Sequence, residues 1–130
     1  MKQLALLLLI AASPSSRAEE PCKDIDPILD SDGSSCSSQE LAKADDELNA
    51  QYKKLLAQLD SDAKINPAAT QAKKELIEAQ RQWVKFRDAD CGAVFTYYLD
   101  GTVRVSAEQS CELSRTRQRT EQLEHLFDGT

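Results

Sequence analysis

The stretch AQRQWVKFRDADC, residues 79–91, carries the strongest structural signal in this chain. Trp83 and Phe86 are three residues apart, a spacing that suits one buried face of a helix. Arg87, Asp90 and Cys91 follow within five residues, so charged and sulfur-bearing side chains crowd the end of the same helix. The stretch therefore predicts a helix whose C-terminal end carries either chemistry or a structural clamp.

Three amphipathic segments are expected to form helices, and they cover residues 37–59, 67–90 and 107–127. Ser37 and Ser106 are each followed three residues later by Glu or Gln, which is the pattern of a capping box. Asn66 is a natural cap for the second helix, and Pro67 suits its first helical position. The sequence thus predicts an all-α fold, a small antiparallel three-helix bundle.

The first two segments each carry a row of side chains with a period of about 3.5 residues. The rows are Leu41, Asp45, Leu48, Tyr52, Leu55 and Leu59, and Ala72, Leu76, Ala79, Trp83, Phe86 and Asp90. Because the connection between the segments is short, they should pack antiparallel. Asp45 then falls beside Phe86 and Arg87, so we expect a structural Asp45–Arg87 ion pair. The alternative is that Asp45 points to solvent at the edge of its row.

The third segment has fewer large apolar groups on its predicted inner face, which consists of Leu113, Thr116, Thr120, Leu123 and Phe127. A longer connection, residues 92–105, precedes it. Asp100 and Gly101 lie there between β-forming residues, which predicts a short hairpin or an irregular loop. Phe95, Tyr97 and Tyr98 either pack beneath this connection, the favoured interpretation, or are exposed for a partner.

The first 18 residues have the features of an export signal. Lys2 precedes an apolar run too short to span a bilayer, and small residues precede a cleavage site after Ala18. Cys22 follows two glutamates and a proline rather than small residues, so a lipid anchor is not expected. We therefore expect residues 1–18 to be a signal peptide and residues 19–130 a single periplasmic or secreted domain without a membrane anchor.

The charge of the chain restricts its partners. Its formal net charge is −6, and loss of Lys2 and Arg17 with the leader lowers it to −8. A chain of this charge is repelled by nucleic acid and by anionic membranes, whereas a basic protein is attracted to it. The charge predicts a basic protein partner and no nucleic acid, and the oligomeric state is not predicted.

Four cysteines follow the leader, and they are Cys22, Cys36, Cys91 and Cys111. An even number in a small exported domain predicts two disulfides, and three pairings are possible. The favoured pairing closes two local loops, Cys22–Cys36 and Cys91–Cys111. Its geometric competitor is Cys36–Cys91 with Cys22–Cys111. Zinc is not expected, because no CxxC spacing is present and the single histidine, His125, is distant in sequence.

No catalytic site is expected. His125 lies near a terminus that should fray, and a compact bundle offers no cleft between facing carboxylates. The DSDG stretch, residues 30–33, fails the calcium-loop pattern at its first and last ligand positions. We therefore expect no enzyme activity, no cofactor and no metal. The candidate partner-binding residues are Asp24, Asp26, Asp30, Asp32, Tyr97 and Tyr98. The alternative for the four aspartates is a solubilising tail.

The stretches ADDELNAQY (44–52) and AQRQWVKFRDADC (79–91) resemble two signature stretches of the lysozyme-inhibitor LprI-type N-terminal domain family. Gly101–Thr102, Cys111 and TRQRTEQL (116–123) follow in the same order. The resemblance implies an exported, disulfide-bonded helical domain that binds lysozyme, and the founding member is a lipoprotein that inhibits it. This chain lacks a lipobox and should be soluble. The expected function is lysozyme inhibition by binding; the alternative is an interaction or structural module of the cell envelope with no lysozyme activity.

Overall fold

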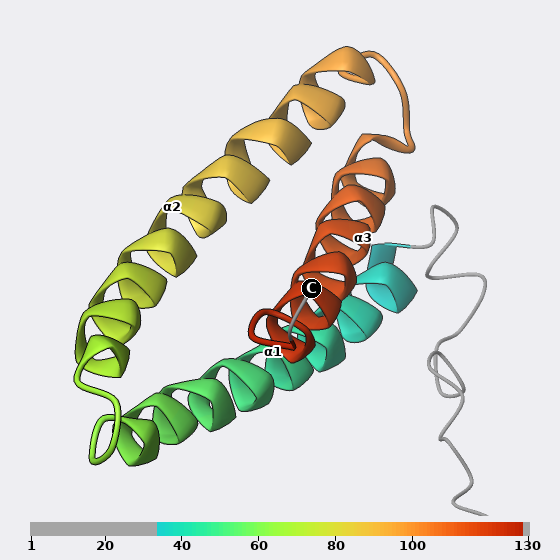
Figure 1. Cartoon of the computed structure of the whole chain (residues 1–130). Helices are drawn as coiled ribbons and strands as arrows, with labels where there is room; N and C mark the ends of the chain where they lie inside the picture. Colours follow the sequence, from blue (N-terminus) through green and yellow to red (C-terminus); the bar gives the residue numbers. More distant parts are fainter. Residues whose placement is uncertain (1–33, 129–130) are drawn as a thin grey trace, which may run out of the picture.

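The computed structural model describes residues 34–128, and that part of the chain contains three α-helices and no strand (Figure 1). The helices are α1 (Ser34–Asp62), α2 (Ala68–Tyr97) and α3 (Arg104–Glu124). The predicted all-α class and three-helix organisation are confirmed. Within the described range, no helix is both long enough and apolar enough to cross a lipid bilayer.

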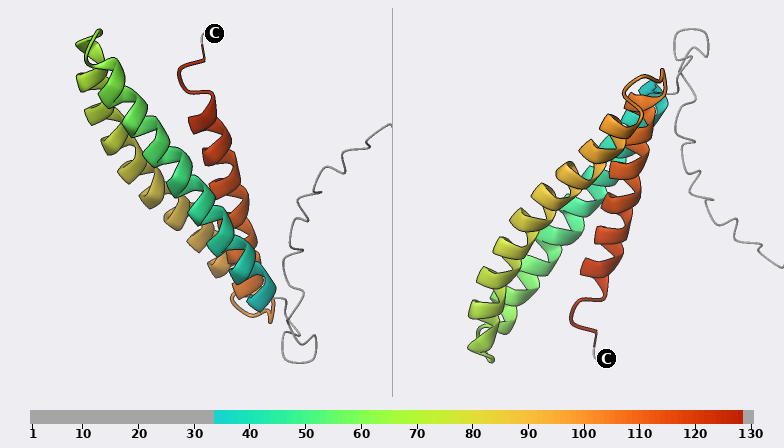
Figure 2. Two further views of the ribbon diagram at one scale, coloured as in Figure 1. Left: turned by 90° about the horizontal axis from the view of Figure 1, so that it is seen from below. Right: turned by 90° about the horizontal axis from the view of Figure 1, so that it is seen from above.

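The helices run up, down and up along one long axis (Figure 2). The start of α1, the end of α2 and the start of α3 therefore meet at one end of the molecule, here called the disulfide pole. The predicted antiparallel packing of α1 and α2 is present, but α1 packs more extensively against α3 than against α2. Thus α3, whose predicted inner face has the fewest large apolar groups, is the main neighbour of α1.

The apolar core extends from the middle of the bundle to the end where α1 connects to α2. Its buried residues are Leu48, Leu55 and Leu59 from α1, Ala69 and Leu76 from α2, and Leu123 from α3. Tyr52, Ala72 and Trp83 pack against this cluster and are partly buried. Burial of each leucine contributes about 2 kcal/mol to folding, so this cluster is the main apolar contribution to the stability of the bundle.

The predicted inner row of α2 is wrong in its C-terminal half. Phe86 is 55% exposed and Ala79 is exposed, whereas Gln80 is buried and the Arg87 side chain is mostly buried. A straight α-helix repeats every 3.6 residues, so a row predicted at 3.5 drifts off the buried face over several turns. The buried face of α2 therefore includes Gln80 and Arg87, and side chains of the other helices form hydrogen bonds with both.

The long connection predicted for residues 92–105, as a short hairpin or an irregular loop, is also wrong in its first part, which is helical. α2 continues seven residues beyond the predicted end at Asp90, and Thr96 Oγ1 donates to the carbonyl of Gly92 at 3.0 Å. An isolated two-stranded ribbon is marginal in water, whereas a helix satisfies its own backbone groups locally. The connection to α3 shortens to residues 98–103.

The other helix boundaries differ by smaller amounts. α1 begins at Ser34 rather than Ser37, and α3 begins at Arg104 rather than Ala107. Ser106 Oγ bonds the carbonyl of Val103 at 3.0 Å instead of capping the helix. The start of α2 is close to the prediction, since Asn66 Oδ1 accepts a hydrogen bond from the Ala68 amide at 3.2 Å.

Cys91 and Cys111 are joined by a disulfide with a Cα–Cα distance of 5.6 Å. This bond excludes the competing Cys36–Cys91 pairing. Of the two expected bridges, the described residues show this one. The other, Cys22–Cys36, involves Cys22, which lies outside the described residues, and it stays a prediction.

Candidate partner-binding surface

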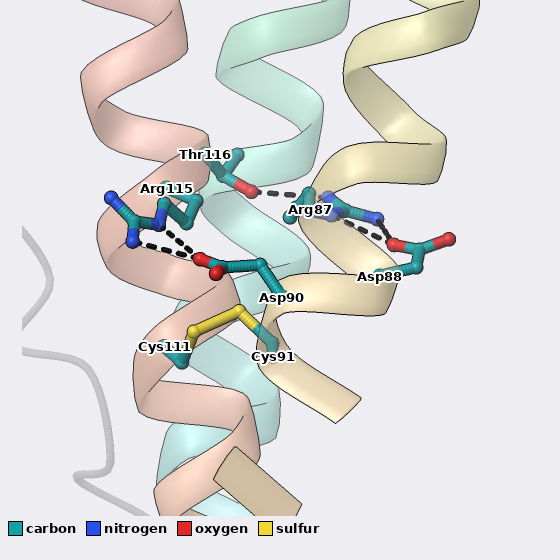
Figure 3. Close-up of a disulfide and its surroundings, with 7 residues drawn as sticks. All are labelled: Arg87, Asp88, Asp90, Cys91, Cys111, Arg115 and Thr116. Atoms are coloured by element: carbon teal, nitrogen blue, oxygen red, sulfur yellow. Dashed lines mark hydrogen bonds and ion pairs between the residues drawn. A yellow bond between two sulfur atoms is a disulfide. The ribbon is translucent and has the colours of Figure 1, made fainter. Parts of the chain in front are cut away.

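Polar side chains centred on Arg87 join the three helices about one helical turn from the Cys91–Cys111 bridge, and we call this group the polar clamp. Arg87 of α2 donates from Nη1 to Asp45 Oδ1 of α1 at 2.9 Å and to Thr116 Oγ1 of α3 at 3.1 Å. Its Nη2 lies 3.0 Å from Asp88 Oδ1 on its own helix (Figure 3). The structure thus brings Asp45 and Arg87 together at the level where the aligned rows place them. The fully buried Thr116 is an additional partner.

A second contact between α2 and α3 lies beside the disulfide. Arg115 Nη2 is 2.7 Å from Asp90 Oδ2, and the next residue, Cys91, bonds to Cys111 (Figure 3). Cys91 is completely buried. The ion pair and the covalent bridge therefore hold the end of α2 and the start of α3 at a fixed separation.

The clamp also shifts the ionisation of its members. Burial by itself lowers the pKa of Arg87, but the hydrogen bond to Asp88 and the charges of Asp45 and Asp88 outweigh it, so the pKa is raised. The pKa of Glu112 is also raised, first by burial and then by repulsion from Glu108 and the two aspartates, against the attraction of Arg87. Carboxylates from all three helices thus interact electrostatically with the Arg87 guanidinium.

Two guanidinium groups lie close to the Trp83 ring. The Arg87 Cζ is 5.3 Å and the Arg119 Cζ is 5.9 Å from its ring centroid, both within cation–π range. Arg119 Nε also donates to the buried Gln80 Oε1 at 3.0 Å, and burial lowers the pKa of Arg119. These polar groups are satisfied by each other, so we assign the clamp a structural role.

Asp90, Cys91 and Cys111 bring a carboxylate and two sulfur atoms within 4.8 Å of one another, a grouping that can resemble a metal site. Both sulfurs are joined in the disulfide and are not available as thiolate ligands. This part of the pole therefore holds the fold together by a covalent bond.

The exposed surface next to the clamp is apolar. We call residues 97–105 the tip, because they close the α2–α3 end of the molecule (Figures 1 and 2). Tyr97 is 81% exposed, and the other exposed large apolar side chains of the tip are Tyr98, Leu99, Val103 and Val105. The favoured interpretation, in which the tyrosines pack beneath the connection, is therefore wrong, because both are exposed. Several exposed large apolar side chains close together in sequence are a feature of interaction sites on small proteins.

Local contacts hold the tip in place. Arg104 Cζ lies 5.4 Å from the ring centroid of Phe95, and its Nη1 donates to the Leu99 carbonyl at 3.0 Å. The Gly101 amide donates to the Tyr98 carbonyl at 2.8 Å. The rings of Tyr97 and Tyr98 meet edge to face with centroids 5.0 Å apart. A preorganised surface of this kind binds a partner at a lower entropic cost than a mobile loop.

Sequence reasoning missed Leu99, Val103 and Val105 as members of this surface. The sequence predicts a hairpin or an irregular loop in this stretch, and neither alternative indicates which of its apolar side chains are exposed. The signal that could have identified them is composition, because residues 94–107 hold only one acidic and one basic residue in an otherwise highly charged chain. The other predicted binding residues, Asp24, Asp26, Asp30 and Asp32, lie outside the described residues and stay a prediction.

The opposite end of the molecule has an apolar hollow of its own, between α1, α2 and the residues after α3. Leu59, Ala69, Ala72 and Phe127 line it. Phe127, predicted on the inner face of the third helix, lies beyond the end of α3 and is half-exposed. Ile65 at the rim is 88% exposed, which makes it a matched control for the apolar residues of the tip.

The helices and the Cys91–Cys111 bridge define a small, disulfide-bonded, all-α domain. A family model described as the lysozyme inhibitor LprI matches residues 29–123, and the chain belongs to this family. It is also 29% identical, over 96% of its length and 94% of the relative's, to an uncharacterized protein of Rhizobium meliloti (strain 1021). No solved structure matches the chain.

Proposed function

We propose that this chain is an exported protein that inhibits lysozyme by binding it through the tip. The observation that carries the proposal is the exposed apolar tip of a chain in the LprI family. Tyrosine is enriched among the residues that dominate binding energies, and Tyr97 and Tyr98 present their rings from a helix end. The disulfide supports export, because such bonds persist in oxidising compartments.

The net charge of the chain supports the same partner. Animal-type lysozymes are basic, and residues 19–130, with a net charge of −8, attract them over distances of about 10 Å at moderate salt. The expected signal peptide, residues 1–18, would deliver the remaining domain to the compartment where lysozyme acts. Inhibition requires occupation of the enzyme by the bound protein and no catalytic group on this chain.

The test is a lysis assay with residues 19–130 and an animal-type lysozyme. We expect a molar excess of the protein to slow lysis of cell-wall suspensions at low salt. The double variant Tyr97→Ala/Tyr98→Ala should weaken inhibition at least tenfold, because about 1–3 kcal/mol is lost for each buried aromatic anchor. Ile65→Ala should leave it unchanged. An unaltered lysis rate with the unmodified protein in excess would reject the proposal for that lysozyme.

A further inference from the structure

The charges of the described residues are unevenly distributed along the molecule. Asp45, Asp88, Glu108 and Glu112 interact electrostatically around Arg87, and we call these four the acidic collar. They come from all three helices and lie behind the tip. Residues 34–48 and 83–117, which form the half of the bundle that carries the tip, hold nine acidic and six basic residues, whereas residues 49–82 and 118–128 hold seven of each. A basic partner is therefore attracted to the pole that carries the tip.

The tip itself carries almost no charge. Asp100 and Arg104 balance each other within residues 94–107, and Arg104 is engaged with Phe95 and the Leu99 carbonyl. The result is a neutral apolar tip beside the acidic collar, in which Asp45 and Asp88 are paired with Arg87 and Glu108 and Glu112 add further negative charge. Its complement on a partner is an uncharged or acidic depression surrounded by basic groups.

A lysozyme offers that complement. Glycoside hydrolases of this type carry two carboxyl groups on either side of the scissile bond, inside the substrate cleft. An acidic side chain placed there would be repelled, whereas apolar and aromatic groups can occupy the space of the sugar rings. Outside the cleft, the basic surface of the enzyme would face the acidic collar.

We infer that the tip enters the substrate cleft of a basic lysozyme, with the acidic collar against the basic rim of that cleft, so that inhibition is competitive with the glycan. The inference rests on the proposed function and adds the site of contact on the enzyme. The end of α2 and the start of α3 suit this role because the Cys91–Cys111 bond and the Asp90–Arg115 pair hold them together.

The deciding experiment is a charge exchange at Thr102, an exposed residue of the tip. Thr102→Glu and Thr102→Lys have similar length, and neither disturbs a buried side chain. Inhibition constants are measured with a soluble chito-oligosaccharide substrate at several concentrations. We expect competitive kinetics for the unmodified protein, and an inhibition constant at least tenfold higher for Thr102→Glu than for Thr102→Lys. Circular dichroism confirms that both variants fold.

A second measurement uses the β-1,4-linked trimer of N-acetylglucosamine, which occupies the cleft of animal-type lysozymes. We expect saturating trimer to displace the protein from lysozyme in an equilibrium binding assay. Formation of a ternary complex, or tighter inhibition by Thr102→Glu than by Thr102→Lys, would overturn the cleft assignment and leave the proposed function intact. Absence of any binding or inhibition by the unmodified protein would reject both.

Discussion

At the scale of single residues, Arg87 is the side chain that links all three helices through polar contacts. It bonds to Asp45 on α1, to Thr116 on α3 and to Asp88 on α2, and its guanidinium lies over Trp83. The Arg87 side chain is 15% exposed and that of Asp45 is 39% exposed, so the pair is partly shielded. Such a pair specifies geometry more surely than it adds stability.

Arg87→Ala should lower the free energy of unfolding by about 2 kcal/mol, because Asp45 and the buried Thr116 lose their partner. The double variant Asp45→Asn/Arg87→Met should lose less, since methionine keeps the apolar stem over Trp83 and the one carboxylate that still loses its contact with Arg87, Asp88, is 54% exposed to solvent. Urea unfolding of Arg87→Ala, Asp45→Asn, Arg87→Met and the double variant measures the differences. Strictly additive losses from the two positions would argue against coupling.

At the scale of the helices, the extension of α2 to Tyr97 decides what the molecule presents to a partner. Had residues 94–105 formed a ribbon, the tyrosines would have faced opposite sides in alternation. In the helix, Phe95 turns back under Arg104 while Tyr97 projects outward. Cys91, six residues before Tyr97, fixes the direction of this last stretch through its bond to α3.

The double variant Cys91→Ala/Cys111→Ala should lower stability by about 3 kcal/mol, the chain-entropy value for a loop of this length. A sequence separation of 20 residues lies between the two cysteines. Guanidinium unfolding of the oxidised parent and of the variant checks the value. An unchanged midpoint would show that the ion pair of Asp90 and Arg115 holds the two helices without the bridge.

At the scale of the whole molecule, the distribution of charge matters more than its total. The acidic collar lies in the half of the bundle that bears the tip, and that half has an excess of acidic over basic residues that the other half lacks. Charges at the edge of an interface act mainly on the association rate, whereas buried apolar anchors act on dissociation.

The association rate with an animal-type lysozyme should therefore fall about tenfold between 20 and 300 mM salt, as screening shortens the reach of the collar. Glu108→Gln/Glu112→Gln should slow association at low salt and have little effect at high salt. Stopped-flow fluorescence measures both rates. A rate that does not depend on salt would show that the collar does not steer the encounter.

Local sequence patterns predicted the three helices, the antiparallel pairing of α1 and α2 and the level at which Asp45 meets Arg87. Each depends on periodicity or on the short connection at residues 63–67, and both are properties of neighbouring residues. The same patterns failed at Phe86, because the small difference between periods of 3.5 and 3.6 accumulates along a long helix.

The sequence by itself determined the helical class, the α1–α2 hairpin, the acidic charge and the presence of cysteines able to form bridges, because these depend on composition and short-range spacing. Only the tertiary structure decided which cysteine bonds to Cys91, that α3 is the main partner of α1, and that Tyr97 is exposed. These features depend on which groups from distant parts of the chain arrive at the same place. Local helix and strand propensities do not determine which distant groups come into contact.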